Sequence, residues 1–355
     1  MKRILNIAGL FFVIALVVVL AAGCDSGATG SAQETAEATE TTETTEAEPV
    51  AQRPSADEID TSETFTLRFS WADPFEPLRQ STSAYALVFK QELERLSGGQ
   101  ITVELYPAGQ VGDQRSSTEQ VARGELEMTN ISSGVLASLY YPPLEIVDMP
   151  FLFSSREHAR RFLDVTTNPF MAELAEGVKE ETGIKLLNVV PFGPRHLTNS
   201  ERIIRSPEDL EGLRIRTMEI TPHMRLIESL GANAVPIPFL ELYTSLQTDV
   251  VDGQENVFQN IMAQNLFEVQ DYVTASSHVM GVGATLINND WYESLPDHLK
   301  AALVEADRTG QLVYNGVAQI LDATAAEELT ERGMEIYYPT PAEMRAFQET
   351  AIPAV

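Results

Sequence analysis

Short alternating segments and segments with helical spacing follow one another along the first part of the chain. Apolar and polar residues alternate at 67–71 and again at 101–105, and a further short strand is predicted at 126–131. Apolar residues recur at helical spacing over 84–96, and a second helix, ending at Gly124, is predicted ahead of the third strand. This order of strands and helices is typical of a parallel sheet with right-handed crossovers.

The second part of the chain repeats this pattern and adds longer elements. The segment P-F-G-P at 191–194 is expected to interrupt a strand and to mark the first crossing between two domains. A helix predicted over 296–332 exceeds the usual length of a globular helix, so it either braces both domains or bends at Gly310 or Gly316. We therefore predict two α/β lobes, joined by more than one strand, with a cleft between them. The remaining strands are predicted at 184–190, 213–217, 235–238 and 279–288, and the remaining helices at 154–163, 221–231 and 239–247.

The N-terminal residues have the pattern of a secretory signal peptide. Lys2 and Arg3 precede an apolar run over 7–22, which is shorter than the roughly 20 residues that a spanning helix needs. The sequence L-A-A-G-C, which ends at Cys24, matches a site where the cysteine is lipidated and the chain is cut before it. We therefore predict a lipoprotein signal peptide at 1–23, export to the periplasm or the outer face of the cytoplasmic membrane, and a lipid anchor on Cys24. An uncleaved anchor or an ordinary signal peptide is the alternative.

Residues 24–63 form a low-complexity acidic segment. They are mostly Thr, Glu, Ala and Ser with almost no large apolar side chain, so they cannot bury enough surface to offset the entropy of ordering. We predict a disordered tether between the membrane and the folded body. The net charge of the whole chain is -28, and the body remains strongly acidic without the tether. This argues against nucleic acid as a partner, and it means that a site for an anion must supply its own positive charge.

The sequence contains no catalytic motif. Its five histidines lack metal-ligand spacing, and H-E-x-x-H, G-x-S-x-G, P-loop and C-x-x-C motifs are absent. Cys24 is the single cysteine of the chain, so no disulfide can form within it. We therefore expect a protein that is not an enzyme and that holds no metal and no cofactor.

Several sequence blocks, in a fixed order, point to one known family. They are P-A-G-Q-V-G, D-M-P-F-L-F, R-H-L-T-N-S, S-P-E-D-L-E-G-L-R-I-R and E-L-Y-T-S-L-Q-T-D-V-V-D-G-Q-E-N, which begin at Pro107, Asp148, Arg195, Ser206 and Glu241. In these blocks the chain resembles the substrate-binding proteins of TRAP transporters, the tripartite ATP-independent periplasmic systems for carboxylate uptake. It departs from the family pattern at two places. Val257 stands where a proline often follows the Glu-Asn pair, and D-P-F-E-P, which begins at Asp73, stands where a histidine is common.

The resemblance implies the two-lobed α/β fold of periplasmic binding proteins, type II-like, with a ligand cleft between the lobes and the long helix bracing both. We assign 64–193 and 282–320 to the first lobe, and 194–281 and 321–355 to the second. The resemblance also implies capture of a small organic acid and its delivery to a small and a large membrane subunit. Related proteins continue with another helical segment where this chain stops at I-P-A-V, so we expect a truncated C-terminus.

Three residues are expected to receive the ligand carboxylate. In relatives, the last arginine of strand 213–217 makes a two-pronged salt bridge with this group, which gives the role to Arg216. A guanidinium is suited to it, because its rigid fork matches two carboxylate oxygens and stays charged when partly buried. Asn256 matches an asparagine that hydrogen-bonds the same carboxylate, and Arg195 matches an arginine that either contacts the ligand or holds the closed cleft together. From the residues alone, Arg216 could equally be solvated and Asn256 could bond its own turn.

Five further residues are candidates for the rest of the site. Phe239 matches an aromatic residue that packs on the ligand, and a place in the core is the alternative. Trp71, Asn130 and Ser132 lie at predicted strand ends, where open α/β sheets collect ligands, and an amide and a hydroxyl there would suit ligand hydroxyl groups. Plain burial is the alternative for Trp71. Glu219 either faces the pocket or complements the dipole of the helix that follows it.

Two other functions are compatible with these features. A receptor of the same fold would pass its bound state to a signalling protein, and an exported enzyme on a two-lobed scaffold would convert its ligand. The sequence does not choose between sugar acids, C4-dicarboxylates, 2-oxo acids and related monocarboxylates, because specificity depends on cleft loops that it does not reveal.

Overall fold

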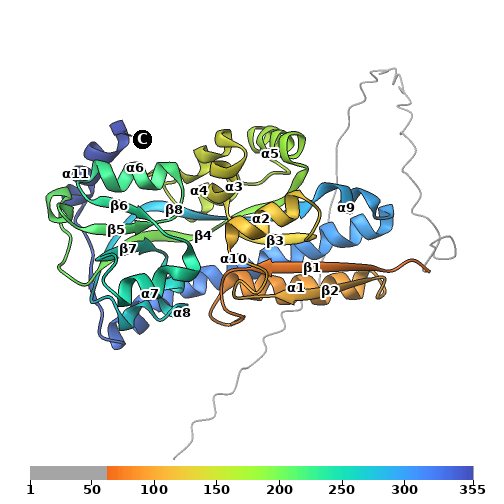
Figure 1. The fold of residues 1–355 in the computed structure, drawn as a ribbon, viewed down its shortest axis with the longest axis horizontal. Coiled ribbons are helices and arrows are strands. Elements are labelled where there is room, and N and C mark those ends of the chain that lie inside the picture. Colours follow the sequence, from red (N-terminus) through yellow and green to blue (C-terminus); the bar gives the residue numbers. More distant parts are fainter. Residues whose placement is uncertain (1–61, 355) are drawn as a thin grey trace, which may run out of the picture. The chain divides into compact units, whose positions relative to one another are not determined.

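One mixed β-sheet runs through the described part of the chain, which is residues 62–354 of the computed structural model (Figure 1). Its strands lie in the order β2-β1-β3-β8-β4-β7-β5-β6, and β9 pairs with β8. The predicted signal peptide, Cys24 and nearly all of the predicted tether lie outside the described residues. The strands are β1 (Phe65–Trp71), β2 (Ile101–Tyr106), β3 (Met128–Ser132), β4 (Ile184–Asn199), β5 (Arg214–Thr217), β6 (Asn233–Pro236), β7 (Gly253–Asn256), β8 (Tyr272–Asn288) and β9 (Glu335–Tyr337).

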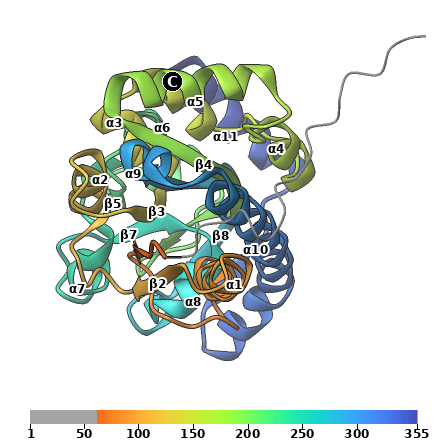
Figure 2. The same ribbon diagram turned by 90° about the vertical axis from the view of Figure 1, so that its right-hand side faces the viewer.

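Helices lie on both faces of this sheet, as a layered α/β fold requires (Figure 2). Side chains cap several of them at the first turn: Asp113 accepts a hydrogen bond from the amide of Ser116 at 2.7 Å, and Asn288 accepts one from the amide of Trp291 at 2.8 Å. The helices are α1 (Ser81–Leu96), α2 (Gln114–Ala122), α3 (Ser133–Leu139), α4 (Arg156–Phe162), α5 (Pro169–Thr182), α6 (Thr221–Ser229), α7 (Leu242–Gln247), α8 (Phe258–Ala263), α9 (Asn289–Ser294), α10 (Asp297–Glu331) and α11 (Pro341–Ala351).

The first half of the sheet has the predicted parallel order. β1 pairs in parallel with β2, from Phe65 opposite Ile101 to Ser70 opposite Tyr106, and with β3 on its other side. The helices α1 and α2 connect these three strands, so the predicted strand–helix–strand–helix–strand unit is confirmed. The carboxyl ends of the three strands therefore meet at one edge of the sheet, where their following loops can form part of a site.

The second half repeats this arrangement around β5. β5 lies between β6 and β7 and is parallel to both, which places Arg216 opposite Val235 on one side and Gln254 on the other. The helix α6 follows β5, and α7 follows β6 after a short 3-10 turn at Phe239–Glu241. Arg216 is thus held rigidly near the carboxyl end of its strand.

Two long antiparallel strands, β4 and β8, pass through both halves of the sheet. The prediction that P-F-G-P interrupts the first of them is wrong, because β4 continues through Pro191 and Pro194 with its pairing register shifted. Bulges tolerate residues that lack an N–H group, and Gly193 takes a φ of 148° there. Arg156 ties this bulge to the long helix, since it donates to the carbonyl oxygen of Pro191 at 2.9 Å and pairs with Asp322.

The long helix α10 contacts both halves of the molecule. It packs against α1 and β4 and, further along, against α8 and β9 (Figures 1 and 2). It is continuous through Gly310 and Gly316. Gly310 allows close approach to α1, because a Cβ atom there would lie 2.7 Å from Cδ2 of Tyr85. The expectation that this helix braces two lobes is confirmed.

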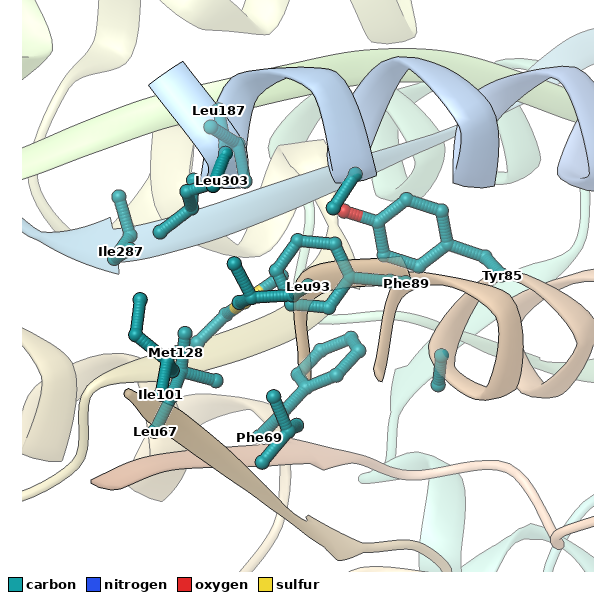
Figure 3. Packing of buried hydrophobic residues seen from close by; sticks show 14 of the residues in the cluster. Leu67, Phe69, Tyr85, Phe89, Leu93, Ile101, Met128, Leu187, Ile287 and Leu303 are labelled. Carbon is teal, nitrogen blue, oxygen red and sulfur yellow. The ribbon is translucent and has the colours of Figure 1, made fainter. Parts of the chain in front are cut away.

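The apolar core is divided in the same way as the sheet. One cluster fills the space between β1–β3, α1 and α10, with the rings of Phe69 and Tyr85 edge to face at 6.0 Å and those of Tyr85 and Phe89 stacked at 5.6 Å (Figure 3). A second cluster lies under α3, α4 and α5, and two further clusters belong to the half built on β5–β7. Separate cores in the two halves are what a two-lobed protein needs in order to move one lobe against the other.

Candidate functional site

Two adjoining recesses lie between the halves of the sheet. The Asp73 recess is lined by Asp73, Asn130 and Ser132 from the first half and by Arg195 and Asn256 from the second. The Arg216 recess is lined by Arg115, Arg216, Glu219, Ile237 and Pro238. Gln114, Met218 and Phe239 line both of them, so the two recesses lie side by side in the cleft between the halves. All the predicted site residues except Trp71 and Cys24 line this cleft.

Arg216 is a buried cation that makes no ion pair with any residue of 62–354. Arg216 is 1% exposed, its Nε donates to the carbonyl oxygen of Ile237 at 2.8 Å, and its buried Nη1 has no hydrogen-bond partner among the described residues. Burial lowers the pKa of Arg216 to about 10, and the charge of Glu255 opposes this shift. The guanidinium therefore remains charged at neutral pH, and it is missing the acceptor that a carboxylate would supply.

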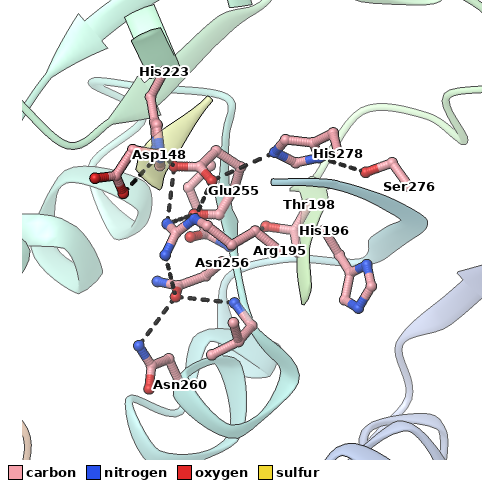
Figure 4. A network of polar contacts seen from close by, with 12 residues as sticks. Asp148, Arg195, His196, Thr198, His223, Glu255, Asn256, Asn260, Ser276 and His278 are labelled. Atoms are coloured by element: carbon pink, nitrogen blue, oxygen red, sulfur yellow. Dashed lines mark hydrogen bonds and ion pairs between the residues drawn. The ribbon is translucent and has the colours of Figure 1, made fainter. Parts of the chain in front are cut away.

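Arg195, in contrast, is fully paired within the protein. Its Nε contacts Oε2 of Glu255, and its Nη2 donates to Oε1 of Glu255 at 2.9 Å and to the carbonyl oxygen of the same residue at 2.6 Å (Figure 4). Burial by itself would raise the pKa of Glu255, but the charges of Arg195 and His223 hold it well below its usual range. The pair is 1% exposed on both sides, so it is a true buried ion pair.

Asn256 is oriented by three donors. Its Oδ1 accepts hydrogen bonds from the amide of Val257 at 3.0 Å, from Nδ2 of Asn260 at 3.1 Å and from Nη1 of Arg195 at 3.4 Å (Figure 4). Because the backbone amide of Val257 can only donate, the side-chain atom of Asn256 that faces it must be the oxygen Oδ1 and not the nitrogen Nδ2. The Nδ2 group is therefore the end of Asn256 that is left to donate to a ligand.

Three more titratable groups surround Glu255. His223 lies 3.5 Å from Glu255 and 3.8 Å from Asp148, and His278 lies 3.5 Å from Glu255 (Figure 4). Burial raises the pKa of Asp148 to about 6, although His223 and a hydrogen bond from Ser133 oppose it, and burial lowers the pKa of His278. Sequence reasoning missed Glu255 and Asp148. A glutamate inside a short strand between Val251 and Val257 was the signal that could have found the first of them.

Of the three candidates in the first lobe, Asn130 and Ser132 line the Asp73 recess, and Trp71 lies in the core. Asn130 donates from Nδ2 to Oγ1 of Thr285 at 2.9 Å, which leaves its Oδ1 as an acceptor. Ser132 is held by its amide, which donates to Oε1 of Gln114 at 2.8 Å, while its buried hydroxyl has no partner. Trp71 lines neither recess: its ring packs 5.3 Å from that of Phe69 in the core, and its buried Nε1 has no partner.

Contacts across the cleft are already made in this structure. Glu219 lies 3.6 Å from Arg115, and Ile220 fits against Gly134 so closely that a Cβ there would lie 2.5 Å from Ile220 Cδ1. Gln80 donates to Asn260 at 3.3 Å across the same gap. These contacts join the start of α1, α2 and α3 to the segment after β5 and to α8, so the two halves touch across the cleft.

Within 62–354 no group of three or more His, Cys, Asp or Glu side chains is arranged to hold a metal ion. In the same residues, no helix has the length and apolar character needed to cross a membrane.

Bacterial solute-binding proteins resemble this chain in sequence and in structure. The family model "Bacterial extracellular solute-binding protein, family 7" (DctP) matches residues 76–355. A solute-binding protein of Verminephrobacter eiseniae is 34% identical over 248 residues, covering 70% of this chain and 72% of that protein. The sialic acid-binding periplasmic protein SiaP of Vibrio cholerae is 28% identical over 272 residues, covering 76% of this chain and 81% of that protein. The crystal structure of a TRAP periplasmic solute-binding protein from Roseobacter denitrificans with bound L-galactonate has a TM-score of 0.76 at 27% identity, covering 82% of this chain and 94% of that chain.

These matches extend over both halves of the sheet and agree with the sequence blocks. The two-lobed fold, predicted from the alternation of elements and from the resemblance, is therefore confirmed. The chain belongs to family 7 of the bacterial extracellular solute-binding proteins, the substrate-binding proteins of TRAP transporters.

Proposed function

We propose that this protein captures a small organic acid between its lobes, which we place at 64–193 with 282–320 and at 194–281 with 321–355. It delivers this acid unchanged to the small and large membrane subunits of a TRAP transporter. The observation that carries the proposal is Arg216, a buried guanidinium whose Nη1 has no partner. Burying an unpaired charge costs free energy, so this arrangement makes sense as one half of a salt bridge whose other half is the ligand.

The ligand carboxylate lies, in this proposal, where the two recesses meet. Arg216 would hold it from one side, and Nδ2 of Asn256 would donate to it from the other, since Oδ1 of Asn256 is already occupied. Arg195 positions Asn256 through its contact of 3.4 Å and is itself neutralised by Glu255. The hydroxyl of Ser132 and Oδ1 of Asn130 would meet ligand hydroxyl groups, and the ring of Phe239 would cover the ligand.

Closure of the cleft couples binding to delivery. The contacts of Ile220 with Gly134 and of Arg115 with Glu219 join the two lobes in this structure, and moving the lobes apart would break them. A ligand shifts the equilibrium toward this form only by interacting with it more strongly than with the open form. Contacts from both lobes to one small molecule meet this requirement, and the membrane subunits would recognise the closed form.

A binding screen tests the proposal. We expect at least one acid, from a panel of sugar acids, C4-dicarboxylates, 2-oxo acids and monocarboxylates, to raise the thermal unfolding midpoint of the purified protein in a saturable way. A ligand at about one hundred times its Kd stabilises a protein by about 2.7 kcal/mol, which is readily measured. Calorimetry would then give Kd, and chromatography of the released ligand would show whether it is unchanged. A panel without any stabilising acid would rule the proposal out.

We also propose that Cys24 carries a lipid anchor, which the L-A-A-G-C sequence supports. The wild-type protein is expected in the membrane fraction of its host or of a bacterial expression host, and Cys24→Ala is expected in the soluble extracytoplasmic fraction. Immunoblots of the fractions measure this. Retention of Cys24→Ala on membranes would show that something other than the thiol holds the protein there.

A further inference from the structure

A carboxylate without a partner faces the Asp73 recess. Asp73 lies two residues after the end of β1, and its backbone oxygen accepts a hydrogen bond from the amide of Ala108 at 2.9 Å, which fixes the loop. Within residues 62–354, no hydrogen bond and no opposite charge compensates its carboxyl group. Burial raises the pKa of Asp73 to about 6, so the group is mostly ionised at neutral pH.

The other titratable groups of this recess do not neutralise Asp73. They are Arg195 and Tyr314. Arg195 is bonded twice to the carboxylate of Glu255, so its charge is already used. Burial and the charge of Asp73 raise the pKa of Tyr314, so this phenol stays neutral, and within 62–354 no hydrogen bond joins it to Asp73. Asp73 is half-buried at the wall of the recess, so a bound molecule that brings a donor to it would supply the hydrogen bond that its carboxylate lacks.

The two recesses thus have opposite requirements. The Arg216 recess holds a cation with an unpartnered Nη1, and the Asp73 recess holds an anion without a partner. They adjoin each other, since Gln114, Met218 and Phe239 line both. A ligand that extends through both meets positive charge at one end and negative charge at the other.

We propose that Asp73 binds the end of the ligand that lies away from Arg216. The bound acid then carries a hydrogen-bond donor at this end, opposite its carboxylate. A protonated nitrogen is preferred to a hydroxyl as this donor. This rests on the proposed function, because the carboxylate on Arg216 orients the molecule. A protonated nitrogen forms a charge-assisted hydrogen bond with Asp73, and a hydroxyl forms a weaker one. A second carboxylate at this end of the ligand would meet the like charge of Asp73, so dicarboxylates are disfavoured.

Four acids built on the same four-carbon chain test this selection: 4-aminobutanoate, 4-hydroxybutanoate, butanoate and succinate. Calorimetry at about pH 8, where Asp73 is ionised, is expected to rank the wild-type affinities in that order, with 4-aminobutanoate at least about tenfold tighter than succinate. In Asp73→Asn this ratio is expected to fall by about tenfold or more, through weaker binding of the amine and stronger binding of succinate. Glu76→Gln, which changes an exposed acid in the same loop, is the matched control and is expected to keep the wild-type ranking.

A measurement without ligand tests the unpaired state of Asp73. Because its folded pKa lies above its unfolded value, ionised Asp73 destabilises the protein increasingly as the pH rises from about 4 through about 6. Asp73→Asn is therefore expected to raise the unfolding midpoint by several degrees at about pH 8 and to leave it nearly unchanged at about pH 4. Equal midpoints of both proteins at both pH values would show a solvated carboxyl group and overturn the inference.

The outcomes separate the inference from the proposed function. If succinate binds the wild-type protein as tightly as 4-aminobutanoate while Arg216→Ala weakens both, the inference is wrong and the proposed function stands. If Arg216→Ala leaves the affinity of every acid unchanged, the proposed function fails, and the assigned orientation of the ligand fails with it. A ratio in Asp73→Asn within about threefold of the wild-type ratio also overturns the inference.

Discussion

Replacing Arg216 by alanine is expected to weaken binding of the organic acid by about two to four orders of magnitude. The guanidinium is 1% exposed, and a ligand carboxylate paired with it would be equally removed from water in the closed cleft. Removing one partner of such a pair leaves the other charge buried and unpaired, which costs about 3–5 kcal/mol. Calorimetry with the acid that emerges from the binding screen measures this loss as a change in Kd.

Two comparisons show whether charge, geometry or folding causes the loss. Arg216→Lys keeps the charge but not the fork, so it is expected to recover only part of the affinity. The unliganded Arg216→Ala protein is expected to unfold at a temperature close to that of the wild-type protein, because the mutation also removes a buried cation whose Nη1 makes no hydrogen bond with the described residues. Weak binding by a fully folded variant would therefore report the missing ligand contact.

Arg214 provides the matched control on the same strand. It is partly exposed and pairs with Asp252, whose Oδ2 also accepts a hydrogen bond from the Arg214 amide at 2.7 Å. Arg214→Ala is expected to change the affinity little. If instead Arg216→Ala binds within about threefold of the wild-type protein, Arg216 does not select the anion, and Arg195 becomes the candidate that remains.

The strands and helices that could be predicted from the sequence are those whose hydrophobic pattern lies within a few neighbouring residues. The parallel unit β1-β2-β3 could be read from alternation and helical spacing because each strand and helix carries its own pattern. The path of β4 could not be read in this way, because its partner β8 is far away in the sequence: Ile184 pairs with Asn288. A proline in a local pattern indicates the end of a strand, and only the pairing shows that Pro191 lies at a bulge.

The site was predictable only in part for a related reason. The resemblance assigned Arg216 and Asn256, and spacing alone would have left both as surface or turn residues. Glu255 was missed because glutamates are rarely buried unless paired, and the pairing arises only when β4 places Arg195 beside β7. Trp71 lies at a strand end, as expected, but the strand's pleat turns its ring into the core. Its role in binding stays a prediction.

Replacing Glu255 by glutamine is expected to destabilise the folded protein by about 3–5 kcal/mol at neutral pH, because it leaves Arg195 as a buried cation without its counter-charge. Chemical denaturation followed by circular dichroism measures this loss as a lower midpoint with an unchanged slope. Glu241→Gln, which removes one exposed carboxylate nearby, is the control and is expected to stay close to the wild-type stability. Adding Arg195→Met to Glu255→Gln is expected to recover part of the loss, since it removes the cation that was left unpaired.

The stability difference between the wild-type protein and Glu255→Gln depends on pH, and this dependence shows whether the charge of Glu255 causes it. The folded pKa of Glu255 is held well below its ordinary value of 4.5, so the wild-type protein gains stability from this group above that value and loses the gain as the pH falls through the folded pKa. The stability difference between wild-type and Glu255→Gln is therefore expected to be full at about pH 7 and to shrink below about pH 4. Asp148, whose pKa is raised to about 6, lowers the stability of the folded protein as the pH rises. It is present in both proteins, so its contribution largely cancels from the stability difference between them. A difference that stays constant down to about pH 2 would mean that Glu255 contributes through packing and hydrogen bonds rather than through its charge.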